Sequence, residues 1–244
     1  MKTPFLSQPV LIVSIIVATM LVLTSCDKRI RKQGSGVITT VTRAVEDFHE
    51  VDADGSYDLI LHVDADTRVV ITTDDNMLSE VQTFVQDGKL FIEMSDDYFN
   101  YKYTKLEVHV YAPAYSNVDL DGSVNTTVQD TIFSPSLTWN HEGSGNNSVK
   151  FSGNTISIKM SGSGDVQATG TAGTSAVTIN GSGKIDALDL VTQNCDARIE
   201  GSGDVYVNCQ QHLDARIDGS GDIRYIGSPT ISTHISGSGS VSTY

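Results

Sequence analysis

Apolar and polar residues alternate through the C-terminal half of the chain, and the alternation restarts at a regular interval. Two of the apolar series are Ile156, Ile158, Met160 and Leu213, Ala215, Ile217. A period of two residues is typical of a β-strand that points alternate side chains into a core, whereas a helix would show a period of about 3.6. We therefore expect this half of the chain to consist of strands.

The tripeptide Gly-Ser-Gly separates successive alternating segments. It begins at Gly143, Gly162, Gly181, Gly201, Gly219 and Gly237, and a fainter copy begins at Gly122. Self-similarity at a short fixed period indicates a solenoid, in which each repeat buries its apolar face only against its neighbours. We expect each coil to contain a strand, a turn and a second strand. The glycines at both ends of the turn should supply backbone angles that are closed to other residues.

The pattern predicts an all-β fold, a parallel β-helix-like solenoid with about 18–20 residues per coil. Upstream of this repeat, alternating strands are expected near 57–63, 68–72 and 105–111, together with a hairpin through Asp87-Gly88. We place the β-rich N-terminal part at residues 42–115 and the repeat solenoid at residues 116–244.

The N-terminus resembles an export signal. Lys2 precedes an apolar run from Val10 to Leu23, which leads into Leu-Thr-Ser-Cys at residues 23–26. This run is shorter than the roughly 20 residues that a membrane-spanning helix needs. The small residues before the cysteine resemble a bacterial lipobox, so we expect residues 1–25 to be a lipoprotein signal peptide and Cys26 to carry the lipid. An ordinary signal peptide and a single membrane-spanning helix are the alternatives.

Residues 26–41 are predicted to be the lipidated cysteine and a flexible tether. Their basic residues could rest on anionic head groups or belong to a solvated linker, and Gly34-Ser35-Gly36 could supply flexibility. We expect a lipid-anchored protein of the cell envelope, on the outer membrane, with its periplasmic or surface face undetermined. Asp27 resembles an inner-membrane retention signal of some bacteria, which leaves the choice of membrane open.

Charge and cysteine content narrow the chemistry. The chain has 16 basic and 30 acidic residues and a net charge of −14, which argues against nucleic acid as a partner. Cys195 and Cys209 could form a disulfide in an exported protein or remain buried as small apolar residues. The sequence contains no His-Glu-x-x-His motif, no phosphate-binding loop and no nucleophile elbow. We expect no cofactor, with calcium as the one candidate.

Acidic residues recur around the most similar turns of the repeat. Glu200, Asp204, Asp218 and Asp222 are expected to crowd one corner of the solenoid. Hard cations bind carboxylate and carbonyl oxygens, so this corner could form a weak calcium site. The alternative, which we favour, is a solvated acidic edge that keeps the rod soluble and discourages end-to-end stacking.

The exposed aromatic residues cluster in a different segment. Tyr98, Phe99, Tyr101 and Tyr103 lie between acids and lysines. A tyrosine-rich loop is a suitable contact surface, because the ring buries area at low entropic cost and its hydroxyl still forms hydrogen bonds. The competing interpretation is that alternate rings cover the end of the solenoid core.

Several segments of the N-terminal part, together with the Gly-Ser-Gly-Asp coils that follow them, resemble a known family. These segments are Phe48–Val51, Asp54–Leu61, Arg68–Leu78 and Asp87–Met94. In this order they resemble the auto-transporter adhesin head, or GIN, family, which is common among envelope lipoproteins of Bacteroidetes, and the resemblance covers residues 42–243. It implies a right-handed all-β solenoid and supplies no catalytic residues. Thr131, in Asp-Thr-Ile, resembles the short O-glycan acceptor of exported proteins in that phylum.

Three classes of function follow from these observations. We expect a non-enzymatic, membrane-anchored envelope lipoprotein that acts as an adhesin-like binding module for glycan or protein surfaces. A structural or regulatory envelope protein without an extracellular ligand is the alternative. A polysaccharide-acting β-helix enzyme is less favoured, because the acids follow the turn period and do not form one isolated pair.

Overall fold

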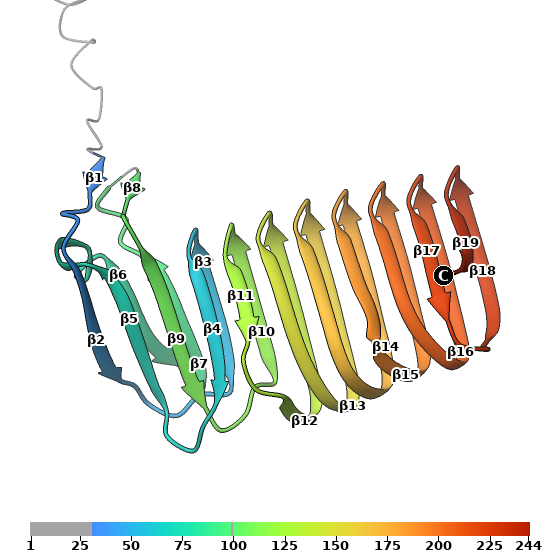
Figure 1. Ribbon diagram of the computed structural model, residues 1–244, viewed down its shortest axis with the longest axis horizontal. Helices are drawn as coiled ribbons and strands as arrows, with labels where there is room; N and C mark the ends of the chain where they lie inside the picture. Colours follow the sequence, from blue (N-terminus) through green and yellow to red (C-terminus); the bar gives the residue numbers. More distant parts are fainter. Residues whose placement is uncertain (1–30, 99) are drawn as a thin grey trace, which may run out of the picture.

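The repeat segments form long strands, each of which turns a corner and continues on the opposite side of the molecule (Figure 1). The computed structural model describes residues 31–98 and 100–244. It is 73% strand and has about seven solenoid turns after a β-rich N-terminal part, which confirms the predicted fold class. The solenoid strands are β10 (Asn117–Gly122), β11 (Asn125–Val128), β12 (Ile132–Gly143), β13 (Asn146–Gly162), β14 (Asp165–Gly181), β15 (Lys184–Gly201), β16 (Asp204–Gly219), β17 (Asp222–Ile226), β18 (Thr230–Gly237) and β19 (Ser240–Thr243).

Successive coils pair in parallel, with equivalent residues opposite one another. Strand β13 pairs with β14 from Asn146 opposite Asp165 to Gly162 opposite Gly181. Between β14 and β15 the register shifts after Gln167, because the coil that ends at Gly201 is longer than the one before it. The glycines of the turns remain opposite one another on both sides of this shift. Differences in coil length are therefore absorbed away from the Gly-Ser-Gly turn.

The two glycines of each turn are required for different reasons. Gly201, the first glycine of its turn, has a φ of +133°, in the left-handed region that favours glycine. Gly203, the second, lies outside that region, but a Cβ atom there would be 2.4 Å from the carbonyl oxygen of Gly183 in the preceding coil. The expectation that both glycines supply unusual backbone angles is therefore wrong for the second, which is required by the close stacking of coils.

The N-terminal part forms the first coil and then closes this end of the rod. Its elements are β1 (Lys32–Gln33), β2 (Ile38–Ala44), β3 (Glu50–Gly55), β4 (Asp58–Val63), β5 (Arg68–Asp74), the 3-10 helix η1 (Asp75–Met77), β6 (Val81–Gln86), β7 (Lys89–Met94), β8 (Tyr101–Lys102) and β9 (Leu106–Ala112). Strands β3 and β4 pair in parallel with β10 and β11, and so begin the stack. Strands β2, β5 and β9 pair in antiparallel fashion on one side, and β6 pairs in antiparallel fashion with β7 on the other.

A single arginine joins the two edge strands of this antiparallel cap. The guanidinium group of Arg43 on β2 donates to the carbonyl oxygens of Val81 at 2.6 Å and Leu78 at 2.8 Å, and to the hydroxyl of Thr83 at 2.9 Å. These bonds tie β2 to β6 and to the segment that precedes β6. The N-terminal end of the solenoid is thus closed by antiparallel strands and one bridging side chain.

The core runs along the whole rod between the two sides of the solenoid. Inward-facing residues such as Trp139, Phe151 and Ile158 are at most 1% exposed, as the alternation predicts. Burial of their apolar surface is the main source of stability, since each is removed from water by its own coil and by the coils on either side. None of the described residues forms a helix with the length and apolarity needed to span a membrane.

Candidate binding surfaces

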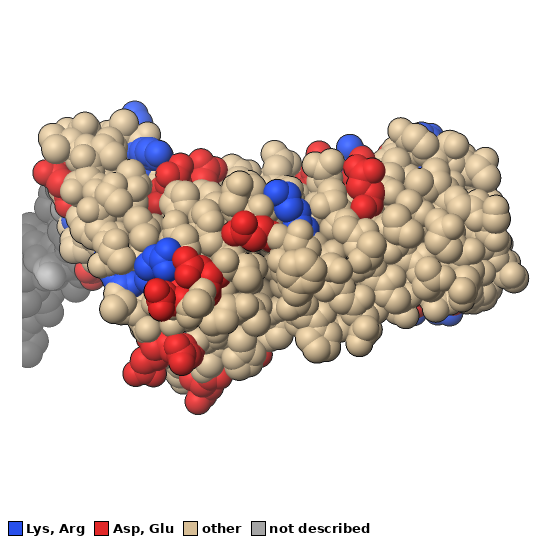
Figure 2. All heavy atoms as spheres, turned by 60° about the horizontal axis from the view of Figure 1, so that its bottom comes forward, with Lys and Arg blue, Asp and Glu red and all other residues tan. Residues whose placement is uncertain are grey.

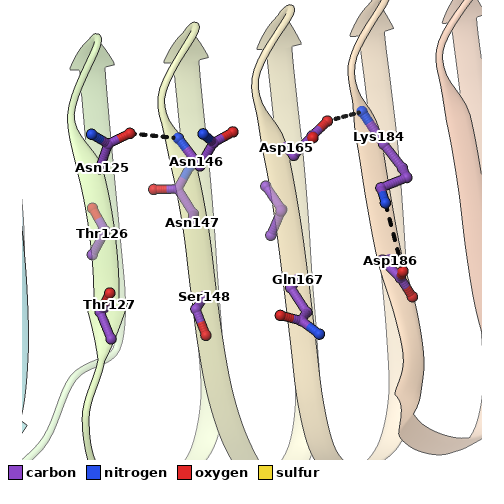
Figure 3. Close-up of a pocket in the computed structure, with 11 residues that line it drawn as sticks. Asn125, Thr126, Thr127, Asn146, Asn147, Ser148, Asp165, Gln167, Lys184 and Asp186 are labelled. Atoms are coloured by element: carbon purple, nitrogen blue, oxygen red, sulfur yellow. Dashed lines mark hydrogen bonds and ion pairs between the residues drawn. The ribbon is translucent and has the colours of Figure 1, made fainter.

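A polar groove crosses four consecutive coils, on the side of the solenoid formed by the strand segments that come after the turns. It lies over β11, β13, β14 and β15 and has a volume of about 600 Å³ (Figure 3). Its lining residues are Asn125, Thr126, Thr127, Asn146, Asn147, Ser148, Asp165, Val166, Gln167, Lys184 and Asp186. Nearly all of them have polar side chains, so the groove offers hydrogen-bonding groups and no aromatic platform.

The row of groove residues nearest the turn connects one coil to the next. The side-chain oxygen of Asn125 accepts the backbone N–H of Asn146 at 3.0 Å, and Asp165 accepts that of Lys184 at 3.1 Å (Figure 3). The same bond recurs beyond the groove, where Asp204 accepts the backbone N–H of Asp222 at 3.0 Å. An Asn or Asp directly after the turn is therefore a repeated structural acceptor, which explains its place in the repeat.

The next row of the groove has no such structural task. Thr127, Ser148 and Gln167 stand at equivalent positions on β11, β13 and β14, and their side chains make no hydrogen bond within the described part of the chain. Thr127 and Gln167 are exposed. The position that follows Gln167 in this row is Asp186 on β15, and a carboxylate oxygen of Asp186 lies 3.8 Å from Lys184 Nζ. The row is a set of unengaged donors and acceptors spaced by the strand separation of about 4.8 Å.

Beneath the groove, polar side chains point into the core. Asn147 is 4% exposed, and within the described residues neither its amide nitrogen nor its amide oxygen has a hydrogen-bond partner. Thr126 lies opposite Asn147 on the neighbouring coil, and its hydroxyl is also without a described partner. His141 is fully buried on the other side of the same turn, where its Nε2 accepts the N–H of Gly145 at 3.1 Å. The apolar pattern gave no sign of these buried polar groups.

The four acids predicted to share a corner are distributed over two rows. Glu200 lies opposite Asp218 before the turn, whereas Asp204 and Asp222 follow it and accept backbone N–H groups of the next coil. The hydroxyl of Ser240 also donates to Asp222 at 2.7 Å and lowers the pKa of that carboxyl group. Within residues 31–98 and 100–244, no three potential ligands come together in a way that could hold a metal ion. Asp204 and Asp222 therefore have a structural use, because each joins its own coil to the next one.

The predicted tyrosine loop lies at the N-terminal end of the rod, around β8. The hydroxyl of Tyr101 donates to the carbonyl oxygen of Ser95 at 2.5 Å. The ring of Tyr98 packs edge-on against that of Tyr101, with 5.6 Å between the ring centroids. Tyr103 packs against the core, and burial raises the pKa of its hydroxyl. These three rings are half-buried, and Phe99 lies outside the described residues.

Part of the segment predicted as a tether is docked on the cap. Lys32 pairs with Glu80, and the N–H of Gly34 donates to the carbonyl oxygen of Lys102 at 2.8 Å. The N–H of Gly36 donates to the fully buried carboxylate of Asp74 at 2.6 Å. The chain is therefore held from Lys32 onward. Cys26, with the rest of residues 1–30, lies outside the described residues.

Two further predicted sites lie within the solenoid. Cys195 and Cys209 are buried free thiols, and hydrogen bonding between them lowers the pKa of Cys195 and raises that of Cys209. Cys209 Sγ also donates to the carbonyl oxygen of His212 at 2.9 Å. Thr131 is half-buried in the connection between β11 and β12.

Comparison with known proteins agrees with this architecture. A family model described as "Putative auto-transporter adhesin, head GIN domain" matches residues 47–229. No curated protein matches the chain. A solved structure of a putative adhesin from Bacteroides fragilis is 26% identical with a TM-score of 0.84, over 87% of this chain and all of that chain.

Two structures from Parabacteroides are also similar. A putative lipid binding protein from Parabacteroides distasonis is 25% identical with a TM-score of 0.77, over 88% of this chain and all of that one. A putative adhesin from Parabacteroides merdae shares the fold at 22% identity with a TM-score of 0.72, over 88% of this chain and 99% of that one. The family match, over residues 47–229, spans most of the chain. The chain therefore belongs to the family of putative auto-transporter adhesin head GIN domains.

Proposed function

We propose that this protein is a membrane-anchored, non-enzymatic binding module of the cell envelope, and that its polar groove binds glycan. The family and the Bacteroides fragilis relative support an adhesin-like role. The observation that carries the glycan proposal is the row formed by Thr127, Ser148 and Gln167, whose side chains are not engaged by the described protein. A glycan offers hydroxyl groups along its length, and these can donate to and accept from such a row at each coil.

The acids of the groove suit binding better than catalysis. Asp165 accepts the backbone N–H of Lys184, and Asp186 faces the ammonium group of that same lysine. Glycoside hydrolysis needs two carboxyl groups that flank the scissile bond, one of which donates a proton. Both groove carboxylates are engaged with Lys184, so the arrangement supports recognition without acid–base chemistry.

The docked segment after the proposed anchor orients the module. Lys32 to Gly36 are held on the N-terminal cap, only a few residues after Cys26. A lipid on Cys26 would therefore hold the cap end near the membrane, and the coils would extend away from it (Figure 1). In this orientation the groove on β11 to β15 lies along the side of the rod, where a glycan of the envelope or of another cell can reach it.

A glycan array probed with the full chain in detergent tests this proposal, followed by calorimetry on any glycan that binds. Replacing Thr127 and Gln167 together by alanine removes two hydrogen-bonding groups and should weaken binding by about 5- to 150-fold, at about 0.5–1.5 kcal/mol for each bond. Gln193→Ala is the matched control, because Gln193 is exposed on β15 but does not line the groove. The absence of saturable glycan binding, or equal binding by the groove variant, would contradict the proposal.

A further inference from the structure

The C-terminal end of the solenoid presents two open strand edges. Strand β18 pairs with β16, and β19 pairs with β17. Figure 1 shows both strands at the end of the rod, opposite the cap. All eight residues of β18 are exposed. Ile231 and Ile235 are 37% and 43% exposed, whereas the residues opposite them in the preceding coil, Leu213 and Ile217, are at most 1% exposed. The last described coil thus leaves a cross-section of the core uncovered.

This end coil also lacks the charges of the coil before it. On β18, Ser232, His234 and Ser236 stand opposite Asp214, Arg216 and Asp218. On β19, Ser240 and Ser242 stand opposite Asp222 and Arg224. Residues 227–244 contain no lysine, arginine, aspartate or glutamate, in a chain whose net charge is −14.

The neutral end is visible on the surface of the molecule. On the face that Figure 2 shows, acidic and basic side chains gather over the N-terminal half and the middle of the rod, and the C-terminal end has few of them. Proteins usually protect an open sheet edge with charges, proline or a covering segment. Among the described coils, the last has open edges, and the charges that would repel another copy are absent from it.

The geometry of this end selects its occupant. The turn at Gly237 places β18 and β19 on opposite sides of the coil, and they run in opposite directions (Figure 1). One extended peptide could pair with only one of these strands. A second copy of the same end offers two strands at the same separation, and a two-fold axis in the plane of the end coil makes every new strand pair antiparallel.

We propose that two copies of this protein associate end to end through β18 and β19. The contact is isologous and therefore stops at the dimer, because the opposite end of each rod is closed by the antiparallel cap and Arg43. The Ile231 and Ile235 side chains of the two copies then cover one another. If Cys26 carries the lipid, the two anchors lie at opposite ends of the joined rods, an arrangement suited to bridging two membranes.

Sedimentation velocity of the full chain in detergent, over a range of protein concentrations, tests this dimer. The wild-type chain should shift from monomer to dimer as its concentration rises, and added salt should not weaken the dimer because its interface is uncharged. Ile235→Lys places a charge on the open edge and should weaken association by about ten-fold or more. Phe133→Lys is the matched control, since Phe133 is a 73% exposed apolar residue on β12, away from this end.

A second variant separates repulsion from any fraying of the end coil. Replacing Ser232 and Ser236 together by aspartate restores the acids that the preceding coil carries at these positions, Asp214 and Asp218, without changing an apolar residue. This variant should melt like the wild type and remain monomeric. The proposal would be overturned if the wild-type chain stayed monomeric at all concentrations, or if neither end variant weakened the dimer. Growth into longer filaments would also overturn it. The groove residues take no part in this experiment, so its failure leaves the glycan proposal intact.

Discussion

Substitution of one turn glycine tests the physical account of the coil stack. In Gly201→Ala, the added Cβ atom would lie 2.4 Å from the carbonyl oxygen of Gly181, and φ at this position is +133°. The same oxygen accepts the backbone N–H groups of Ser202 at 2.9 Å and Gly203 at 3.0 Å. The alanine must therefore adopt a strained backbone and also displace an acceptor that joins two coils.

The expected cost is the sum of these two effects. Holding a non-glycine residue in this backbone region costs about 1–3 kcal/mol. Weakening two backbone hydrogen bonds at about 0.5–1.5 kcal/mol each adds about 1–3 kcal/mol. The free energy of unfolding should fall by about 2–6 kcal/mol. For a domain of this size that corresponds to a decrease in Tm of about 4–24 °C, at about 2–4 °C per kcal/mol.

Thermal melting followed by far-UV circular dichroism measures this loss, with two neighbouring variants for comparison. Ser202→Ala changes an exposed residue of the same turn and should shift Tm by less than about 2 °C. Gly203→Ala introduces the steric clash without the unusual φ, so its effect should lie between the other two. If Gly201→Ala and Ser202→Ala melt together, the stacking argument is refuted.

Three further predictions concern the cap and the anchor. Asp74→Ala removes the acceptor of the N–H of Gly36 and of the N–H and hydroxyl of Thr104, and it should lower the free energy of unfolding by about 2–4 kcal/mol. Asp189→Ala, at an exposed position, should leave the free energy of unfolding unchanged, and urea titration of the two variants measures the difference. Burial alone would raise the pKa of Asp74, but these donors outweigh it and lower the pKa below its usual value. The stability from Asp74 should therefore be present above the ordinary aspartate pKa of about 3.9 and be lost as pH falls through the lowered value, and a smaller dependence of unfolding on pH in Asp74→Asn would show this. Cys26→Ala should release the protein into the aqueous fraction after cell breakage, and retention with the membranes would contradict lipid attachment.

Much of the fold follows from local patterns in the sequence. The period of two identifies strands because alternate side chains of a strand point to opposite faces. The recurrence of Gly-Ser-Gly identifies the coil because each turn needs a glycine in the left-handed region. These signals are short in range and repeat at every coil, so the sequence alone was enough to predict an all-β solenoid with this period.

The roles of individual polar residues depend on neighbours that are a whole coil away. The sequence shows an acid after the turn, but not that Asp204 accepts the N–H of Asp222 in the next coil. It likewise suggests flexibility at Gly34 to Gly36, whereas the carboxylate of Asp74, far away in the chain, holds this segment on the cap. Hydrogen bonds of this kind form only when the stack exists, so no local pattern encodes them.

The period, the strands and the turn glycines follow from the sequence alone. Two surface features emerge only when the coils stack: the row of Thr127, Ser148 and Gln167 on one side, and the uncharged edges of β18 and β19 at the end of the rod. Equivalent residues repeat along the chain, yet only stacking shows which repeats are covered by a neighbour and which are left open. A side chain's exposure depends on what lies on both sides of its coil, and that is a property of the assembled solenoid.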